Sequence, residues 1–299
     1  MSLTIFSTAK AFTGRTALIQ RNAIRSWTVL TPRPEVILLG SDAGSAEICT
    51  ELGIRHVPTV ASRGGVPLVS DIFRQAQALA GGGVLAYVNA DIILPPRFTE
   101  MAARIEAAGG PFLAVGRRID LTQEDAVDFA SCRWAEELMA RARARGSLMP
   151  SSWIDHFTFS RGLYADIPDF AIGRTGWDNW LVWKAAATGA RVIDVTRFCP
   201  VIHQRHDYSH AGDAAAVFAG DEARRAQGLV GHWSRYHSVL HARWMLSADG
   251  ALVPARGLPY RLARPRRAVA HALRFTVPLR RKLIDRRLAR ALRPGVAER

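Results

Sequence analysis

The sequence predicts an α/β fold in which a doubly wound, mostly parallel central sheet is flanked by helices. Short apolar runs alternate with longer stretches of helical periodicity through the first 115 residues, as in parallel strands joined by helices. Breaks such as Gly81-Gly82-Gly83 and Pro95-Pro96 punctuate this alternation. The chain has 299 residues, of which 48% are hydrophobic, so it can bury a full-sized core.

The first half of the chain contains four expected strand and helix pairs. Proline residues after the first helix and Gly53 after the second give these helices definite ends. The expected strands are Leu3–Ser7, Glu35–Leu39, Val84–Val88 and Phe112–Val115. The expected helices are Ala17–Leu30, Ser45–Leu52, Pro67–Ala80 and Pro96–Ala108.

The second half is less regular. It predicts a helix over Ala126–Arg145, a strand over Ile154–Phe159, a helix over Trp177–Thr188 and a strand over Arg191–Val195. Beyond Val201 the chain is rich in His, Gly and Asp, which predicts loops with short elements. We therefore expect a globular domain over residues 1–245, followed by a linker and tail over residues 246–299.

The positive charge is concentrated in that tail. Residues 256–299 carry 13 Arg and one Lys against two acidic residues, which accounts for +12 of the net charge of +14. Arg alternates there with apolar residues, as in a helix attracted to an anionic membrane surface. Nucleic-acid binding is the less favoured alternative because no aromatic platform or known motif accompanies the charge, and a solvated tail without a target is a third.

The remaining bulk features indicate a cytoplasmic protein, peripheral on the inner face of the plasma membrane if the tail binds lipid. No run of 18 apolar residues is present, and the first residues lack the pattern of a signal peptide. The three cysteines, Cys49, Cys132 and Cys199, are widely spaced, which argues against a disulfide framework or a zinc site.

The segment Val88–Pro96 is the first candidate for chemistry. The apolar run Val84–Val88 leads into Asn89-Ala90-Asp91 and then a double proline, which places Asp91 at the carboxyl end of a buried strand. Ligands bind at that edge of an open α/β sheet. Asp91 can cap the next helix, or it can hold Mg²⁺ or Mn²⁺ against a substrate phosphate.

A second candidate is Asp178, which follows Gly176-Trp177 at an expected helix start and has Trp180 and Trp183 nearby. Aromatic faces beside a carboxylate suit a sugar, and the carboxylate could take a proton from a hydroxyl as a general base. The alternative is that Asp178 caps the helix while the tryptophans belong to the core.

The third candidate is the pair His203 and His206. Their spacing is compatible with metal ligands, and imidazole can join a carboxylate on Mn²⁺. A hydrogen-bonded polar loop is the alternative for each of them.

A nucleotide site is suggested by Arg21 and by Asp42-Ala43-Gly44-Ser45, which lie next to the ends of early strands. The sequence has no G-x-G-x-x-G after the first strand and no P-loop, which weakens a dinucleotide or P-loop interpretation.

Together these motifs resemble the GT-A-fold glycosyltransferases that use nucleotide sugars, including family 2-like and β-1,4-galactosyltransferase-like enzymes. Asn89-Ala90-Asp91 is similar to their D-x-D motif, with Asn in place of the first Asp. Asp42-Ala43-Gly44-Ser45 resembles the D-D-G-S loop, and Gly176-Trp177-Asp178-Asn179 resembles G-W-x-x-E-D with one acidic residue instead of two. The resemblance covers about residues 1–245.

The resemblance implies an inverting, metal-dependent glycosyltransferase that moves a sugar from a nucleotide-sugar donor to a glycan or lipid-linked acceptor. Its implied metal ligands are Asp91 and His203, with His206 as the alternative, and its base is Asp178. The donor would be bound by Arg21, Asp42, Arg74, Asn89 and Asp91, and the acceptor by Trp177, Asn179 and Trp180. A nucleotidyltransferase of related fold and a non-catalytic glycan-binding or scaffold protein remain the alternatives.

Overall fold

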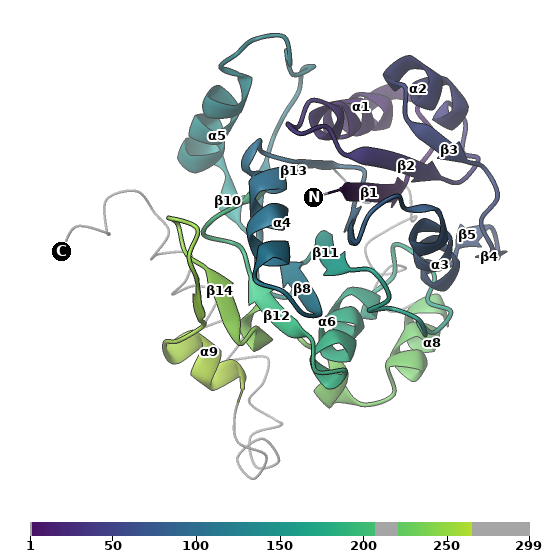
Figure 1. Cartoon of the computed structure of the whole chain (residues 1–299). Helices are drawn as coiled ribbons and strands as arrows, with labels where there is room; N and C mark the ends of the chain where they lie inside the picture. The colour runs from purple at the N-terminus through teal and green to yellow at the C-terminus, as the bar shows by residue number, and fades with distance from the viewer. Residues whose placement is uncertain (1, 207–220, 265–299) are drawn as a thin grey trace.

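A computed structural model describes residues 2–206 and 221–264 of the chain (Figure 1). Residues 265–299, which make up most of the predicted basic tail, lie outside the described residues.

A nine-stranded sheet forms the centre of the molecule. Its order is β15 (Leu252–Pro254), β14 (Trp244–Leu246), β12 (Arg191–Asp194), β8 (Phe112–Val115), β11 (His156–Ser160), β6 (Val84–Val88), β1 (Leu3–Thr8), β2 (Glu35–Leu39) and β3 (Arg55–Val57). Strand β11 runs antiparallel between β6 and β8, and β15 runs antiparallel to β14. The other neighbours are parallel, so the predicted α/β class with a mostly parallel sheet is confirmed.

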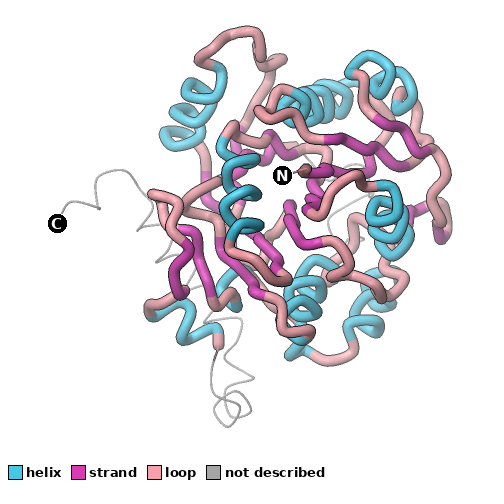
Figure 2. The backbone as a smooth tube through the Cα atoms, viewed as in Figure 1, coloured by secondary structure: helices cyan, strands magenta, loops and turns pink. Residues whose placement is uncertain are grey.

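Helices cover both faces of this sheet because its strands are apolar on both sides. Along β1, for example, Ile5 packs into the core on one face and Phe6 into the core on the other. The first face is covered by α1 (Gly14–Thr28), α2 (Ser45–Leu52) and α4 (Arg97–Ala107); the second by α3 (Val69–Leu79), α6 (Trp177–Ala187) and α8 (Asp221–Val230). Figure 2 shows the strands enclosed by these helices. Among the described residues, no helix has the length and apolar character needed to cross a membrane.

A second, smaller sheet lies beyond the carboxyl ends of inner strands of the first. It has the order β10 (Ser147–Leu148), β9 (Arg118–Leu121), β13 (Val201–Gln204) and β7 (Ile92–Ile93), and α5 (Trp134–Arg145) packs against it. It lies there because β7, β9 and β13 follow β6, β8 and β12 along the chain. Its register sets His203 opposite Asp120 on β9 and opposite Ile92 on β7. Two short strands, β4 (Ser62–Arg63) and β5 (Val66–Pro67), form a separate hairpin.

One expectation about the second half is wrong. The helix predicted from Ala126 begins only at Trp134, because Asp128 accepts a hydrogen bond from the Ala130 N–H and Asn22 accepts one from the Val127 N–H. Such side-chain bonds compete with helical ones. The short elements predicted beyond Val201 include strand β13, whose pairing with two other short strands is not visible in a local pattern. Residues 207–220 of this stretch lie outside the described residues.

The sheet also continues past residue 245, where the sequence predicted the end of the domain. Strand β14 crosses that position, β15 pairs with it, and α9 (Leu258–Ala263) packs beside them. The Tyr260 hydroxyl donates a hydrogen bond of 2.6 Å to Asp194 on β12. The described part of the chain up to Arg264 is therefore tied to the sheet.

Candidate active site

Asp91 lies where the main sheet passes into the small one. It follows β6 in a tight turn, closed by a hydrogen bond from the Ile92 N–H to the Asn89 carbonyl, and it precedes β7. Its side chain is 22% exposed, and its buried Oδ1 atom has no hydrogen-bond partner among the residues that the structure describes. The carboxylate is thus held at the edge of the sheet with one oxygen uncommitted.

The small sheet brings two histidines to this carboxylate. The Nε2 atom of His203 lies 3.5 Å from Asp91 Oδ2, and the Nε2 atom of His206 lies 3.1 Å from the same oxygen. One nitrogen or oxygen atom from each of the three residues lies within 4.8 Å of the others. The structure therefore brings together the predicted ligand Asp91, the predicted ligand His203 and its alternative His206.

The three residues interact strongly in the absence of an ion. Burial raises the pKa of Asp91, but the neighbouring His203 and His206 lower it well below the usual range of an aspartate. Burial lowers the pKa of His203, but Asp91 and Asp120 have the larger combined effect and raise this pKa to about 9. A positive charge between these carboxylates is consequently favourable.

This donor set fits a divalent cation. One carboxylate and two imidazoles are ligands that Mn²⁺ accepts, and Mg²⁺ is also held through carboxylate oxygens. The uncommitted Oδ1 of Asp91 supplies an oxygen without breaking an existing hydrogen bond. Asp91, His203 and His206 would hold the ion, leaving its other positions for substrate oxygens or water.

A polar array extends from His203 away from Asp91. His203 Nδ1 lies 3.1 Å from Asp120 Oδ1, which accepts a hydrogen bond of 2.8 Å from Arg118 Nε. Arg118 Nη1 donates a second bond of 2.8 Å to Asp155 Oδ2. Asp155 Oδ1 accepts a bond of 2.7 Å from the Asn89 side chain. The Asn89 Oδ1 atom accepts a bond of 2.9 Å from the Tyr87 hydroxyl, so both ends of this amide are engaged within the protein.

Asp178 lies on the other side of Asp155. It occupies the first turn of α6, which begins after Gly176 at a φ of 99°, where an added Cβ would lie 3.1 Å from Tyr236. Burial raises the pKa of Asp178 to about 7, and the charge of Asp155 adds to that effect. The backbone N–H groups of Asn179, Gly176 and Asp178 lower this pKa in part. A carboxyl group with this pKa can exchange a proton near neutral pH.

The predicted acceptor residues are not placed for direct contact. Trp177 and Trp180 are 5% and 4% exposed, because they pack into the core beneath α6. The Asn179 side chain donates to the Ser152 carbonyl at 3.2 Å and so holds the loop before β11. The exposed ring in this region is Trp153, which is 36% exposed and lies 5.0 Å from the Arg118 guanidinium.

The predicted donor residues lie on separate elements. Asp42 is exposed in the loop between β2 and α2, at the carboxyl edge of the sheet. Arg21 forms a 2.5 Å ion pair with Glu51 on α2. Arg74 is 68% exposed and pairs with Asp71 of its own helix. Within the described part of the chain, no hydrogen bond or ion pair joins any of these three residues to Asp91, so their donor role stays a prediction.

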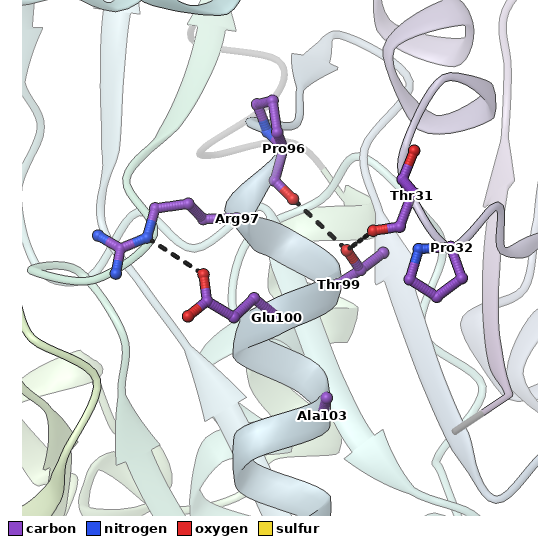
Figure 3. A pocket seen from close by; sticks show the side chains of 7 residues that line it. All are labelled: Thr31, Pro32, Pro96, Arg97, Thr99, Glu100 and Ala103. Carbon is purple, nitrogen blue, oxygen red and sulfur yellow. Dashed lines mark hydrogen bonds and ion pairs between the residues drawn. The ribbon is translucent and has the colours of Figure 1, made fainter.

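A surface hollow lies elsewhere. It has a volume of about 550 Å³ and is lined by Thr31, Pro32, Pro96, Arg97, Thr99, Glu100 and Ala103. Figure 3 shows Arg97 beside Glu100, and Thr99 bonded to the Thr31 carbonyl. These contacts join the start of α4 to the loop after α1, and none of the residues of the polar array lines this hollow.

Sequence reasoning missed Arg118, Asp120, Asp155 and Trp153. A signal for two of them exists in Arg118-Ile119-Asp120-Leu121, which alternates polar and apolar residues as a half-buried strand does. The partnership of Asp155 with Arg118 and Asn89 depends on strand pairing and has no local signal.

No protein-family model matches this sequence, and no curated protein is significantly similar to it. Solved structures of glucosyl-3-phosphoglycerate synthase from Mycobacterium tuberculosis are similar to parts of the chain. One, in complex with Mn²⁺, uridine diphosphate and glucosyl-3-phosphoglycerate, is 17% identical with a TM-score of 0.46, covering 79% of this chain and 80% of that one. Another, with Mn²⁺, uridine diphosphate and phosphoglyceric acid, is 15% identical with a TM-score of 0.47, covering 86% and 87%. Similarity of this size does not transfer an activity.

Proposed function

We propose that this chain is a metal-dependent glycosyltransferase that moves a sugar from a nucleotide-sugar donor to an acceptor hydroxyl. The observation that carries the proposal is the convergence of Asp91, His203 and His206 at the carboxyl edge of the sheet. Burial raises the pKa of Asp178 to about 7, and its carboxyl group interacts with the charge of Asp155. Asp155 belongs to the polar array that contacts His203. A cation site beside a carboxyl group that can exchange a proton suits attack by a hydroxyl on a phosphate-activated carbon.

The residues divide the reaction between them. When bound, Mn²⁺ or Mg²⁺ would neutralise negative charge on the donor diphosphate. Asp178 would accept the proton of the acceptor hydroxyl as its oxygen bonds to the anomeric carbon. The bond from that carbon to the diphosphate oxygen would break at the same time, releasing the nucleoside diphosphate and inverting the configuration. Trp153, the exposed ring beside the array, would offer an apolar face to the acceptor.

Donor, acceptor and location also belong to the proposal. Asp42, in the loop after β2, would contact the nucleotide, and a glycan or lipid-linked acceptor would approach from the side of Asp178. Residues 256–299, which carry +12 of the net charge, would hold the enzyme on an anionic membrane surface.

The deciding experiment follows the products. Purified protein is incubated with a panel of nucleotide sugars, with and without Mn²⁺, and nucleoside diphosphate is measured. Metal-dependent release of nucleoside diphosphate supports the transferase. Pyrophosphate formed from a nucleoside triphosphate and a sugar phosphate would favour a nucleotidyltransferase instead. Sugar binding with neither product would favour a non-catalytic glycan-binding protein.

A further inference from the structure

Behind the metal-binding group, Asp120 contacts the ring nitrogen of His203 that points away from Asp91. The two residues are register partners on the parallel strands β9 and β13, so their side chains rise from the same face of the small sheet. Nδ1 lies 3.1 Å from Asp120 Oδ1, within ion-pair distance although the two atoms do not meet in hydrogen-bond geometry, and both side chains are nearly buried, at 7% and 10% exposed.

The negative charge of Asp120 beside Nδ1 favours Nε2 as the nitrogen of His203 that binds an ion. A neutral imidazole carries its hydrogen on one nitrogen and its free electron pair on the other. A carboxylate at Nδ1 stabilises the hydrogen there and leaves the electron pair on Nε2, the atom that faces Asp91. Carboxylates in this position also fix the ring orientation of metal-ligating histidines.

Arg118 holds Asp120 in place. Its guanidinium donates to Asp120 through Nε and to Asp155 through Nη1, each at 2.8 Å. Its side chain is only 8% exposed, and the Trp153 ring lies 5.0 Å away. Burial lowers the pKa of Arg118, but Asp155, Asp120 and Asp91 raise it well above its ordinary value, so the cation between the carboxylates is permanent.

We infer that Asp120 is a positioning residue that presents His203 Nε2 to the metal, and that Arg118 clamps Asp120 in the required orientation. Through Asp155 and Asn89 the same guanidinium fixes the turn that carries Asp91. The inference rests on the proposed metal site and names the residues that set its affinity.

The test measures binding of Mn²⁺ alone to the full chain by isothermal titration calorimetry. Asp120→Asn, which keeps the shape and removes the charge, is expected to raise the dissociation constant by about 10- to 100-fold. The matched control is Asp194→Asn, because Asp194 is as deeply buried as Asp120 but contacts Thr196 and Tyr260 instead. The control is expected to bind Mn²⁺ within about twofold of the unaltered chain.

A second variant keeps the test decisive if Asp120→Asn does not fold. In Arg118→Gln/Asp120→Asn one positive and one negative charge are removed together, so the net charge of the buried array is unchanged, although Asp155 loses its guanidinium partner. Pulsed electron paramagnetic resonance then counts the imidazole nitrogens coupled to bound Mn²⁺. We expect the coupling from one imidazole to weaken or disappear in this variant and both to persist in Asp194→Asn.

The outcomes separate this inference from the proposed function. If the unaltered chain binds no Mn²⁺, the metal site itself is contradicted. If His203→Ala loses binding while Asp120→Asn and the double variant bind as tightly as the unaltered chain with both nitrogen couplings, the positioning role is overturned. Weakened binding in the Asp120 variants, with unchanged binding in Asp194→Asn, supports it.

Discussion

Asp120 and Asp194 are equally buried aspartates that lie at different places in the sheets and titrate in opposite directions. Asp120, on the small sheet, is 7% exposed, and Asp194, on β12, is 6% exposed. Burial raises the pKa of both, but His203 and Arg118 overcome this at Asp120, whose pKa falls below its usual range. Among the described residues, Thr196 and Tyr260 are the hydrogen-bond partners of Asp194, and its pKa stays raised although the charge of Arg117 lowers it in part.

The difference lies in the kind of partner. Two cationic side chains, Arg118 and His203, lie beside Asp120. The small sheet therefore places charged groups next to the sheet edge where ligands bind. The hydrogen-bond donors to Asp194 are neutral, the charge of Arg117 only partly offsets burial, and the bond from Tyr260 joins α9 to β12. Buried carboxylates therefore mark a reactive region only when the groups around them carry charge and face an open edge.

The largest expected effect on turnover comes from replacing Asp91, the proposed metal ligand. Asp91→Asn should lower metal-dependent release of nucleoside diphosphate by about 10²- to 10³-fold, because the cation and its charge are lost. Asp194→Asn should leave turnover within about twofold. Steady-state rates and melting curves of both variants check this. Equal turnover in Asp91→Asn and the unaltered chain would remove Asp91 from the mechanism.

Asp178→Asn should lower kcat by about 10²-fold or more, with little change in donor affinity. In the unaltered chain the rate should rise with pH through about 7, the pKa of Asp178, because the base must be ionised. That limb should be missing in the variant. Collapse of donor affinity would instead place Asp178 in the donor site.

Replacing the two buried aspartates by Asn should change the free energy of unfolding in opposite directions at neutral pH. The folded state favours ionised Asp120, so its contribution is present above the usual aspartate pKa and lost as pH falls. Asp120→Asn should therefore cost about 3 kcal/mol at neutral pH, the scale for breaking a buried charge cluster, and less in acid. The folded state favours protonated Asp194, so Asp194→Asn should match the unaltered chain in acid and be as stable or more stable at pH 7. Denaturant unfolding at two pH values measures this, and equal losses at both sites would refute the contrast.

Trp153→Ala should raise the acceptor KM several-fold without changing Mn²⁺ affinity. Trp153 lies over the Arg118 guanidinium, whereas Trp233 is 45% exposed and its ring lies beside His232 at a tilt. Trp233→Ala is the control because it removes an exposed ring of the same size that contacts His232 instead of Arg118. Equal KM values in the two variants would exclude Trp153 from acceptor binding.

The smallest expected effect on turnover comes from the C-terminal residues. A chain that ends at Arg264 keeps Tyr260 and its bond to Asp194, so it should fold and retain activity on a water-soluble acceptor. It should lose salt-sensitive binding to anionic vesicles, because most of the basic residues of 256–299 are removed. Co-sedimentation with anionic and neutral vesicles compares the two chains. Equal sedimentation would contradict the membrane role, and tight RNA or DNA binding without lipid preference would favour nucleic acid.

The sequence predicted what local patterns encode. Strands β1, β2, β6 and β8 and the helices between them follow from apolar runs and their breaks, and Asp91 follows from its place after β6. The role of Asn89 could not be read, since it depends on Asp155, which immediately precedes β11, the antiparallel neighbour of β6. Asp120 was missed because β9 is short, and because only its register with β13 places Asp120 beside His203. Trp177 and Trp180 were assigned to the acceptor because an aromatic pattern does not reveal which rings a core will bury.

The most direct test of the central claim is thermal stabilisation by a nucleotide-sugar panel in the presence and absence of Mn²⁺. A ligand that binds the folded state raises its melting temperature. We predict that at least one nucleotide sugar stabilises the unaltered chain only with Mn²⁺, and that the shift is lost in Asp91→Asn and kept in Asp194→Asn. The absence of any shift, or an equal shift without Mn²⁺ and in Asp91→Asn, would contradict the account.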